Sequence, residues 1–252
     1  MVDVDLSAII VPIVCFVFIA FFHAFEFRGE GPTRGLFKRV RKGWVEENYL
    51  KGQQAVNTTR DYVRVSLFFG NTAILIANFA AGFAATRYAT CSDAEGGCTS
   101  NDIQLMIKIG CIVALMLSIF FLFTQCSRFI IHFSFMINTR DVNGVPLPKE
   151  LTNRVFNHAH DYYGIGIRMY FMTIPVFAWV FTEWCLLAVT PIYLYIIHGL
   201  ESSSFMTKEL SAFQAQEQEK AKLLQSNAEE TEENKGDGEK REPLAVQGDT
   251  RV

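Results

Sequence analysis

The chain has 252 residues, half of which are hydrophobic, and 23 of its residues are Phe. This number of large apolar side chains exceeds what the core of a soluble domain of this size needs. The composition therefore argues against a soluble domain and predicts a membrane protein. The net charge of -3 hides an uneven distribution, because basic residues crowd segment 28–64 and acidic residues crowd the chain after residue 201.

The first apolar run covers residues 6–25, which matches the roughly 20 residues needed to cross about 30 Å of hydrocarbon. A cleaved signal peptide is the alternative, but Asp3 and Asp5 stand where a positively charged region is expected, and the run is too long. We therefore predict a helix that stays in the membrane. Further apolar runs at 65–85 and 103–123 predict two more spanning helices.

The last apolar run, residues 163–199, is too long for one crossing, which takes about 17 to 25 residues. Its interior "FTEWC" places a carboxylate and an indole where a hairpin at the membrane interface tolerates them. We predict crossings at 163–181 and 184–199; one tilted helix followed by a surface helix is the alternative. The fold class is then all-α, an integral membrane helical bundle of about five transmembrane helices within residues 1–200.

Charge sets the orientation. The segment between the first two predicted spans is strongly basic, whereas the segment between the second and third contains only Arg87 against three carboxylates. By the positive-inside rule the basic segment is cytosolic and the amino terminus faces outward. Five crossings then put residues 201–252 in the cytosol, as a helical and then, from about residue 225, disordered tail. The expected location is a secretory-pathway or plasma membrane.

Only two of the six cysteines, Cys91 and Cys98, lie in a hydrophilic loop, "CSDAEGGC". This loop faces outward in the orientation above, on the oxidising side of a secretory-pathway membrane, so we predict a disulfide between them. The same orientation predicts that the sequon at Asn57 is never glycosylated, because it lies in the cytosolic basic segment.

Three stretches carry a family resemblance: "RKGWVEENYLKGQQAVNTTRDYVRVSLFFGNTAILIANFAAGFA", "IKIGCIVALMLSIFFLFTQCSRFIIHFSFMINT" and "YYGIGIRMYFMTIPVFAWVF". In this order they resemble a multi-pass membrane family of plants and bacteria, catalogued as domain of unknown function five-nine-nine. The resemblance implies an integral membrane fold and no established activity. This chain has "FTEWC" where the family has a Gly-Pro turn, and family members commonly lack the loop cysteine pair and the acidic tail.

A basic amphipathic helix is predicted between the first two spans. Its apolar residues recur every three to four positions, and basic residues fill the positions between them, which is typical of a helix lying on anionic lipid. Such charges also orient a protein during insertion without binding a particular lipid, and this alternative stays open. The residues are Leu36, Phe37, Val40 and Trp44 on the apolar face, and Lys38, Arg39, Arg41 and Lys42 between them.

Arg128 and His132 stand one helical turn apart at the cytosolic end of the third span, and Arg168 begins the fourth at a similar predicted depth. Together they form a candidate site for an anion or a lipid headgroup, against the alternative of snorkelling and capping contacts. The ligand-type residues of "NHAHD" match no strong metal motif, so we expect no metal and no cofactor.

Within the second span, Asn71 and Asn78 lie on one helical face, beside the small residues Gly70, Ala81, Gly82 and Ala84. We predict that this face packs on the third span, with Thr124 and Gln125 as partners of the amides. The middle of each predicted span lacks acidic residues, which argues against an ion-coupled transporter.

We therefore predict a non-enzymatic multi-pass membrane protein whose partners are membrane lipids, a cytosolic protein or a second copy of itself, with no nucleic-acid partner. The carboxyl-terminal "DTRV" places Thr250 and Val252 where a PDZ ligand has its two recognised side chains. A channel or carrier subunit is the first alternative, and an enzyme acting on lipids the second.

Overall fold

The structure is a computed structural model that describes residues 6–28, 32–93, 97–140, 143–201, 208, 211–213, 215–216 and 218–225. The chain divides into two units, residues 1–202 and 203–252. The second unit has residues 218–225 in a helix, and Thr250 and Val252 lie outside the described residues. The described residues of the first unit form six helices: α1 Leu6–Arg28, α2 Pro32–Asn48, α3 Gln53–Ser92, α4 Ser100–Met136, α5 Lys149–Phe181 and α6 Glu183–Glu201.

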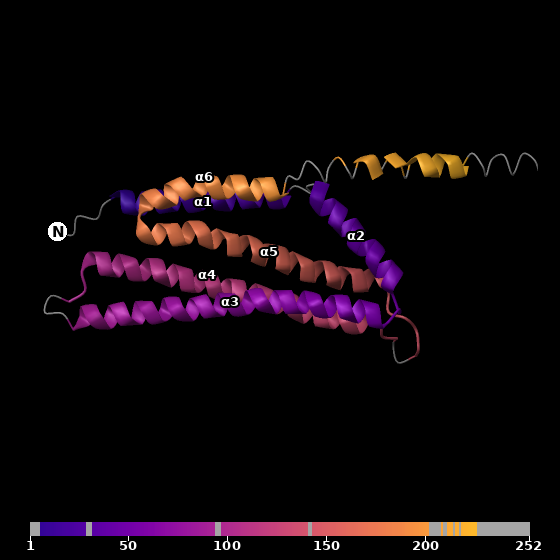
Figure 1. The fold of residues 1–252 in the computed structure, drawn as a ribbon, viewed down its shortest axis with the longest axis horizontal. Coiled ribbons are helices and arrows are strands. Elements are labelled where there is room, and N and C mark those ends of the chain that lie inside the picture. Colours follow the sequence, from indigo (N-terminus) through magenta and orange to yellow (C-terminus); the bar gives the residue numbers. More distant parts are fainter. Residues whose placement is uncertain are drawn as a thin grey trace, which may run out of the picture. The chain divides into compact units, whose positions relative to one another are not determined.

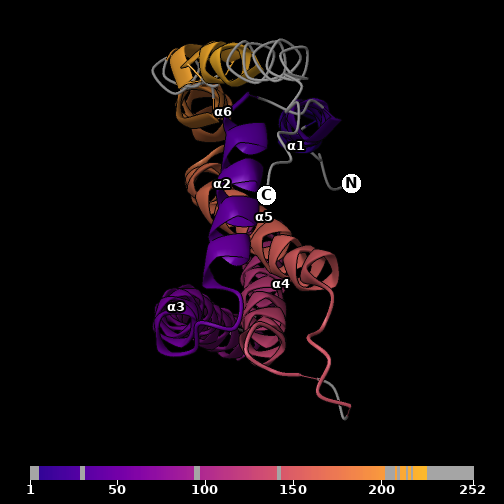
Figure 2. The same cartoon turned by 90° about the vertical axis from the view of Figure 1, so that its right-hand side faces the viewer.

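Five of these helices lie alongside one another, and α2 stands across one end of them (Figure 1). Helix α3 packs on α4, α4 on α5, α5 on α6 and α6 on α1, while α2 contacts α5. The start of α1, the end of α3, the start of α4 and the turn between α5 and α6 share one end of this unit. Seen from the opposite end, α2 runs from the side of α1 and α6 to the side of α3 and α4 (Figure 2).

Among the described residues, α3, α4 and α5 are long and apolar enough to cross a membrane, and α1 and α6 hold shorter apolar stretches, Ile10–Ala24 and Glu183–Gly199. The outward faces of the helices carry large apolar side chains; Phe21, Phe68, Phe79 and Phe181 are each more than two-thirds exposed. A soluble protein rarely exposes so much apolar surface. These features indicate a helical membrane protein, with three helices meeting the length criterion rather than the five expected.

The predicted break in the last apolar run lies at Thr182, which is extended between α5 and α6. Its hydroxyl accepts a hydrogen bond from the Cys185 backbone N–H at 3.1 Å, so Thr182 caps the start of α6. The two helices on either side of the break pack against each other. Pro175 and Pro191 lie inside α5 and α6, as expected for residues within the two helices.

Phe123 of α4 forms the centre of the bundle and is fully buried. It stacks on Phe69 of α3, with ring centroids 5.4 Å apart. A Cβ atom added at Gly166 of α5 would lie 3.1 to 3.3 Å from the Phe123 ring, and one added at Gly70 of α3 would lie 3.5 Å from the Phe123 Cβ. The two glycines thus let α3 and α5 approach α4 at one level.

A tight corner turns the chain from α2 into α3. Gly52 has a φ of 70°, which favours glycine, and its N–H donates to the Asn138 side-chain oxygen at 3.1 Å. The neighbouring Leu50 N–H donates to the Ile137 carbonyl at 3.0 Å. These bonds hold the end of α2 and the start of α3 against the end of α4, which fixes the position of α2 beside α5.

Candidate functional site

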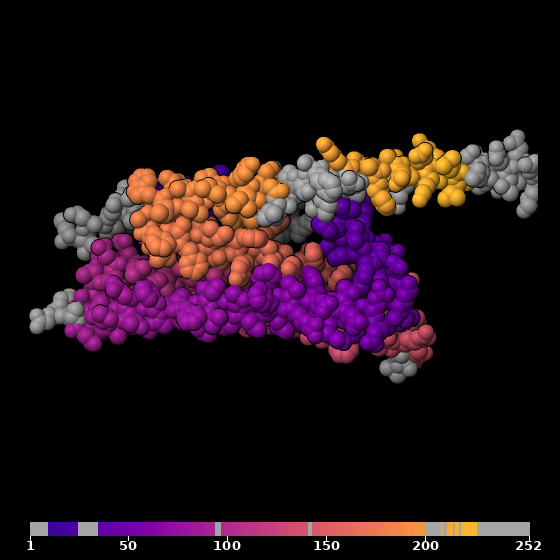
Figure 3. Space-filling model, in the orientation of Figure 1, coloured from indigo at the N-terminus to yellow at the C-terminus, as the bar shows by residue number. Residues whose placement is uncertain are grey.

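A basic cavity of about 350 Å³ lies between α2 and α5. Helix α2 contributes one wall, and the second to fourth turns of α5 contribute the other. Figure 3 shows α2, in indigo and violet, at this end of the first unit. The lining residues are Gly35, Lys38, Arg41, Arg154, Asn157, His158 and Asp161.

Among the described lining residues, Lys38, Arg41 and Arg154 carry positive charges and Asp161 is a carboxylate. Arg41 donates from Nε to the side-chain oxygen of Asn157 at 3.0 Å, which fixes its guanidinium at the wall. A guanidinium matches the geometry of phosphate oxygens, and an ammonium adds a point charge. The cavity therefore suits a singly or doubly charged phosphate group.

The four basic residues predicted on α2 separate into two pairs. Lys38 and Arg41, three residues apart, line the cavity. Arg39 and Lys42 are not among the described lining residues; both are exposed, as Lys38 is, and Lys42 lies 3.9 Å from Glu46 in an exposed ion pair. The basic residues of α2 thus include two that face a defined site.

The structure corrects the position expected for Trp44. Its indole packs inside the protein, with ring centroids 6.2 Å from Phe133 and 5.8 Å from Phe156. Phe37 and Val40 are the apolar side chains of α2 that stay exposed. The α2 residue buried most deeply in this contact is Val45. The reason is that α2 is anchored on α4 and α5, which periodicity within one helix does not reveal.

Two apolar cavities continue along the same face of α5. The first, of about 290 Å³, lies against α1 and is lined by Phe16, Ile19, Ala20, His23, Ile165, Arg168, Met169 and Met172. The second, of about 410 Å³, is lined by Pro12, Ile13, Phe16, Cys111, Leu115, Met172, Val176 and Trp179. The α5 residues of the three cavities recur at spacings of three and four, so they form one helical face from Arg154 to Trp179.

Arg128, His132 and Arg168 do not form one site. Arg128 and His132 are exposed on α4, and Arg128 lies over the ring of its neighbour Phe129, 5.2 Å from the centroid. Phe129 stacks on Tyr162, so this part of α4 is level with Tyr162. Arg168 stands six residues further along α5, about 9 Å at 1.5 Å per residue, and lines the cavity against α1. The expected common depth is therefore wrong.

The histidines of "NHAHD" point to different neighbours. His158 lines the basic cavity. His160 Nδ1 lies 3.0 Å from the hydroxyl of Tyr62 on α3. Among the described residues, no group of three His, Cys, Asp or Glu is placed to hold a metal ion.

The packing face predicted for α3 is also corrected. Asn71 and Asn78 are exposed and do not face α4. The buried residues are smaller ones, Ser66, Gly70, Ala73 and Ala77. Of the small residues named from the sequence, Gly70 is the one that lies in the contact. Thr124 donates to the Phe120 carbonyl of its own helix at 2.8 Å.

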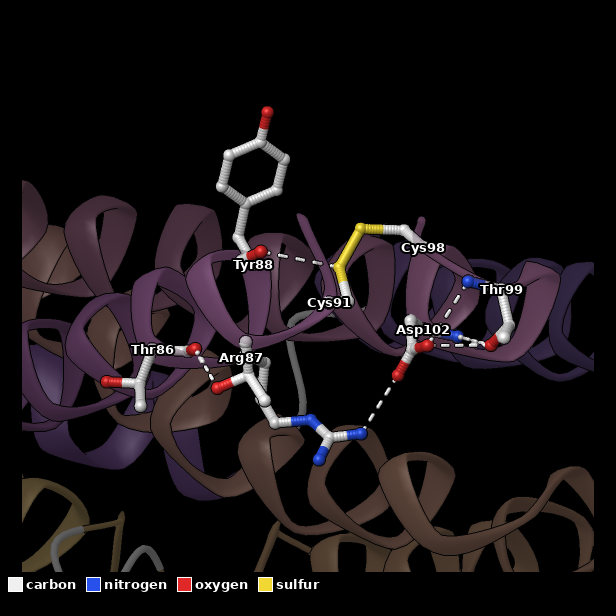
Figure 4. Close-up of polar contacts among 8 residues, drawn as sticks. Thr86, Arg87, Tyr88, Cys91, Cys98, Thr99 and Asp102 are labelled. Atoms are coloured by element: carbon white, nitrogen blue, oxygen red, sulfur yellow. Dashed lines mark hydrogen bonds and ion pairs between the residues drawn. A yellow bond between two sulfur atoms is a disulfide. The ribbon is translucent and has the colours of Figure 1, made fainter. Parts of the chain in front are cut away.

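At the other end of the bundle, Cys91 and Cys98 are joined by a disulfide that closes a loop with a sequence separation of seven (Figure 4). Arg87 contacts Asp102 at 2.9 Å beside it. Thr99 and Asp102 form a capping box at the start of α4. The hydrogen bonds from Thr99, with the nearby Arg87, hold the pKa of the Asp102 carboxyl below its usual value.

An ion pair near this end was missed from the sequence. Lys108 Nζ of α4 lies 2.8 Å from Glu183 Oε1 in the first turn of α6, and the two side chains are only 11% and 20% exposed. The Lys108 ammonium also lies over the Trp179 ring, 5.5 Å from its centroid. A lysine inside the apolar run 103–123 is the sequence signal for such a pair, because a charge at that depth needs a partner.

The fold and these sites define a class: a helical membrane protein with polar clusters at both ends and a cavity-lined helix, α5. A family model described as "Protein of unknown function, DUF599" matches residues 7–205. The chain belongs to this family, as the resemblance indicated. Neither curated proteins nor solved structures match the chain.

Proposed function

We propose that this protein is a non-enzymatic, multi-pass membrane protein that binds the phosphate headgroup of an anionic lipid in the cavity between α2 and α5. The observation that carries the proposal is the grouping of Lys38, Arg41 and Arg154 around a space of about 350 Å³. This volume falls at the lower end of small-molecule sites. A phosphate there accepts hydrogen bonds from the two guanidinium groups and from the ammonium group.

The proposed topology has five crossings with α2 on the cytosolic side. The charge asymmetry of the sequence supports this orientation, since the basic segment contains α2. A second support is that the disulfide loop and the turn at Thr182 lie at the end of the unit opposite to α2 (Figure 1). In this arrangement the basic cavity lies at the headgroup level of the cytosolic leaflet, where anionic lipids are concentrated.

The test compares two double variants with the same change in net charge. Lys38→Gln with Arg41→Gln removes two charges that line the cavity, whereas Arg39→Gln with Lys42→Gln removes two exposed charges beside it. Binding of phosphatidate to each purified protein is measured by native mass spectrometry, with phosphatidylcholine as the neutral lipid. Thermal unfolding is recorded for all proteins, because the first variant also loses the bond from Arg41 to Asn157.

We expect the cavity variant to lose about 3 kcal/mol of binding free energy, about 1.5 kcal/mol for each charged hydrogen bond to the phosphate, or roughly 150-fold in affinity. The matched variant should lose far less. Equal losses in the two variants would mean that α2 attracts anionic lipid through its overall charge, and the headgroup site would then be rejected.

A channel or carrier subunit is the second candidate, favoured by the exposed amides of Asn71 and Asn78 on α3. Polar side chains that face lipid at membrane depth gain from a partner helix. We infer that this face associates with a second copy of the chain. Asn71→Leu with Asn78→Leu should then lower the oligomer fraction in bilayers, measured by single-molecule photobleaching, compared with Thr72→Val beside them; an unchanged fraction would remove this support.

The tail adds a proposed cytosolic partner. Thr250 and Val252 match the recognition positions of a PDZ ligand, whose carboxylate is captured by backbone N–H groups. A pull-down with the carboxyl-terminal peptide should recover a PDZ protein, and peptides with Thr250→Ala or without Val252 should not. Equal recovery by all three peptides would reject this partner.

A further inference from the structure

The first apolar cavity begins one helical turn beyond the basic cavity. Asp161 is the last α5 residue of the basic cavity, and Ile165 is the first α5 residue of the apolar one. Four residues of helix rise about 6 Å. The two cavities therefore follow each other along one face of α5, with charge at one end and hydrocarbon surface next to it.

The apolar part is long enough for an acyl chain. The two apolar cavities share Phe16 and Met172, and their α5 walls extend from Ile165 to Trp179. Fourteen residues of helix rise about 21 Å. One leaflet of hydrocarbon is about 15 Å deep, half of the ~30 Å core, so an ordinary acyl chain fits lengthwise.

Among the described residues that line the first apolar cavity, Arg168 and His23 are polar. His23 Nε2 lies 2.7 Å from the hydroxyl of Tyr193 on α6, which fixes the imidazole against α6. Arg168 stands two turns beyond Asp161 on the same face of α5. A glycerolipid has ester carbonyls between its phosphate and its chains, and these carbonyls accept hydrogen bonds from a guanidinium.

We propose that the cavity between α1 and α5 holds one acyl chain of the same lipid whose phosphate binds between α2 and α5. This inference rests on the proposed headgroup site and makes the ligand a phosphoglycerolipid rather than free phosphate. The basic end selects the anionic headgroup, and the apolar face of α1 and α5 takes the chain. The order of the sites along α5, first the basic cavity, then Arg168 and then the apolar walls, matches the order of phosphate, ester and acyl chain in such a lipid.

The test fills the chain cavity without touching the basic one. Ala20→Phe puts a ring into the cavity wall on α1, and Ala81→Phe makes the same change at an exposed position of α3. Long-chain phosphatidate and glycerol 3-phosphate are titrated against the full-length protein. A phosphatidate with a photoreactive group on its acyl chain is cross-linked to the native sequence, so that one measurement does not depend on either variant.

We expect long-chain phosphatidate to bind at least about 100-fold more tightly than glycerol 3-phosphate, and Ala20→Phe to weaken the long-chain lipid by about tenfold. Ala81→Phe should leave its affinity unchanged. The cross-linked peptides should come from the α1 and α5 walls of the cavity.

Two failures are distinguishable. In the first, the cross-links lie outside α1 and α5, Ala20→Phe leaves the affinity for phosphatidate unchanged, and the Lys38→Gln, Arg41→Gln variant still binds phosphatidate more weakly. This result would overturn the chain cavity and keep the headgroup site. Phosphatidate binding that is unchanged in the Lys38→Gln, Arg41→Gln variant would overturn the headgroup site and the chain cavity with it.

Discussion

Arg41 of α2 donates a hydrogen bond from Nε to the side-chain oxygen of Asn157 on α5, at 3.0 Å. Asn157 in turn donates to the Asn153 side-chain oxygen at 3.3 Å, so its amide is held by its own helix. The contact spans 116 residues of sequence and closes one wall of the basic cavity. The position of the Arg41 guanidinium therefore depends on the packing of α2 against α5.

Asn157→Ala removes this bond and should destabilise the protein by about 1 kcal/mol, the usual net value of a hydrogen bond. Phosphatidate affinity should also fall, because the Arg41 side chain gains rotational freedom. Thermal unfolding and lipid titration check the two effects. Asn101→Ala is the control, since it removes an exposed amide from the first turn of α4 and leaves the bond from Arg41 in place; an equal loss of lipid affinity in both variants would contradict the role given to Asn157.

The Lys108–Glu183 ion pair joins α4 to α6, and we expect Lys108→Met to lower stability by about 1.5 to 3 kcal/mol, the range for hydrogen bonds to charged groups. Part of this loss comes from removing the positive charge beside the Glu183 carboxylate. Lys42→Met breaks an exposed pair and should cost less than about 1 kcal/mol. Chemical unfolding in detergent compares the two; similar small losses would show that Lys108 contributes little.

The Cys91–Cys98 disulfide should be present in protein from its native membrane. Closing so short a loop is expected to contribute about 2 kcal/mol by the chain-entropy relation. Peptide mapping by mass spectrometry without reduction checks the bond, and unfolding of Cys91→Ser checks its effect on stability. Cys185→Ser, at an exposed free thiol, is the control. Free thiols at both positions would contradict the outward placement of the loop.

Asp102 predicts a pH dependence. Its pKa is lowered in the folded protein, mainly by the hydrogen bonds from Thr99, so the carboxylate stabilises the fold above the ordinary pKa of 3.8 and this contribution disappears as the pH falls through the lower folded value. Asp102→Asn should therefore be less stable than the native sequence at neutral pH, and the difference should shrink below about pH 3.8. Unfolding midpoints of both proteins, measured from neutral pH to below pH 3.8, test this prediction. A stability difference that does not change with pH would show that the Asp102 carboxylate is not responsible.

The sequon at Asn57 tests the orientation. Asn57 is an exposed residue near the start of α3, so access does not prevent modification. A cytosolic position predicts no glycan in a glycosylating cell, while a sequon appended ahead of Met1 should be modified. Glycosidase treatment and gel mobility give the result. A shift that Asn57→Gln abolishes would invert the topology and move α2 away from the cytosolic leaflet.

Hydropathy predicted the apolar cores of the helices and the break at Thr182, because a run too long for one crossing, with a charged residue inside it, has few alternatives. The ends of α3 and α4 extend well beyond the predicted spans. Segments 53–64 and 124–136 are helical but mix polar and apolar residues, so a hydropathy window stops before them. Helix length was therefore underestimated wherever a helix leaves the apolar layer.

Helix faces were harder to predict than helix positions. In a membrane both the lipid and the protein interior are apolar, so hydrophobicity does not tell which side of α3 meets α4. The contact is made by small residues such as Gly70 and Ala73, while Asn71 faces outward. The basic cavity had no signal at all in local sequence, because Lys38 and Arg154 come together only when α2 folds across the end of α5.

A structure of the full-length protein in a bilayer disc that contains phosphatidate tests the headgroup site most directly. We expect density for a phosphate within hydrogen-bond distance of Lys38, Arg41 and Arg154, with a chain that enters the space between α1 and α5. A cavity that holds only water while phosphatidate is present in excess would contradict the account.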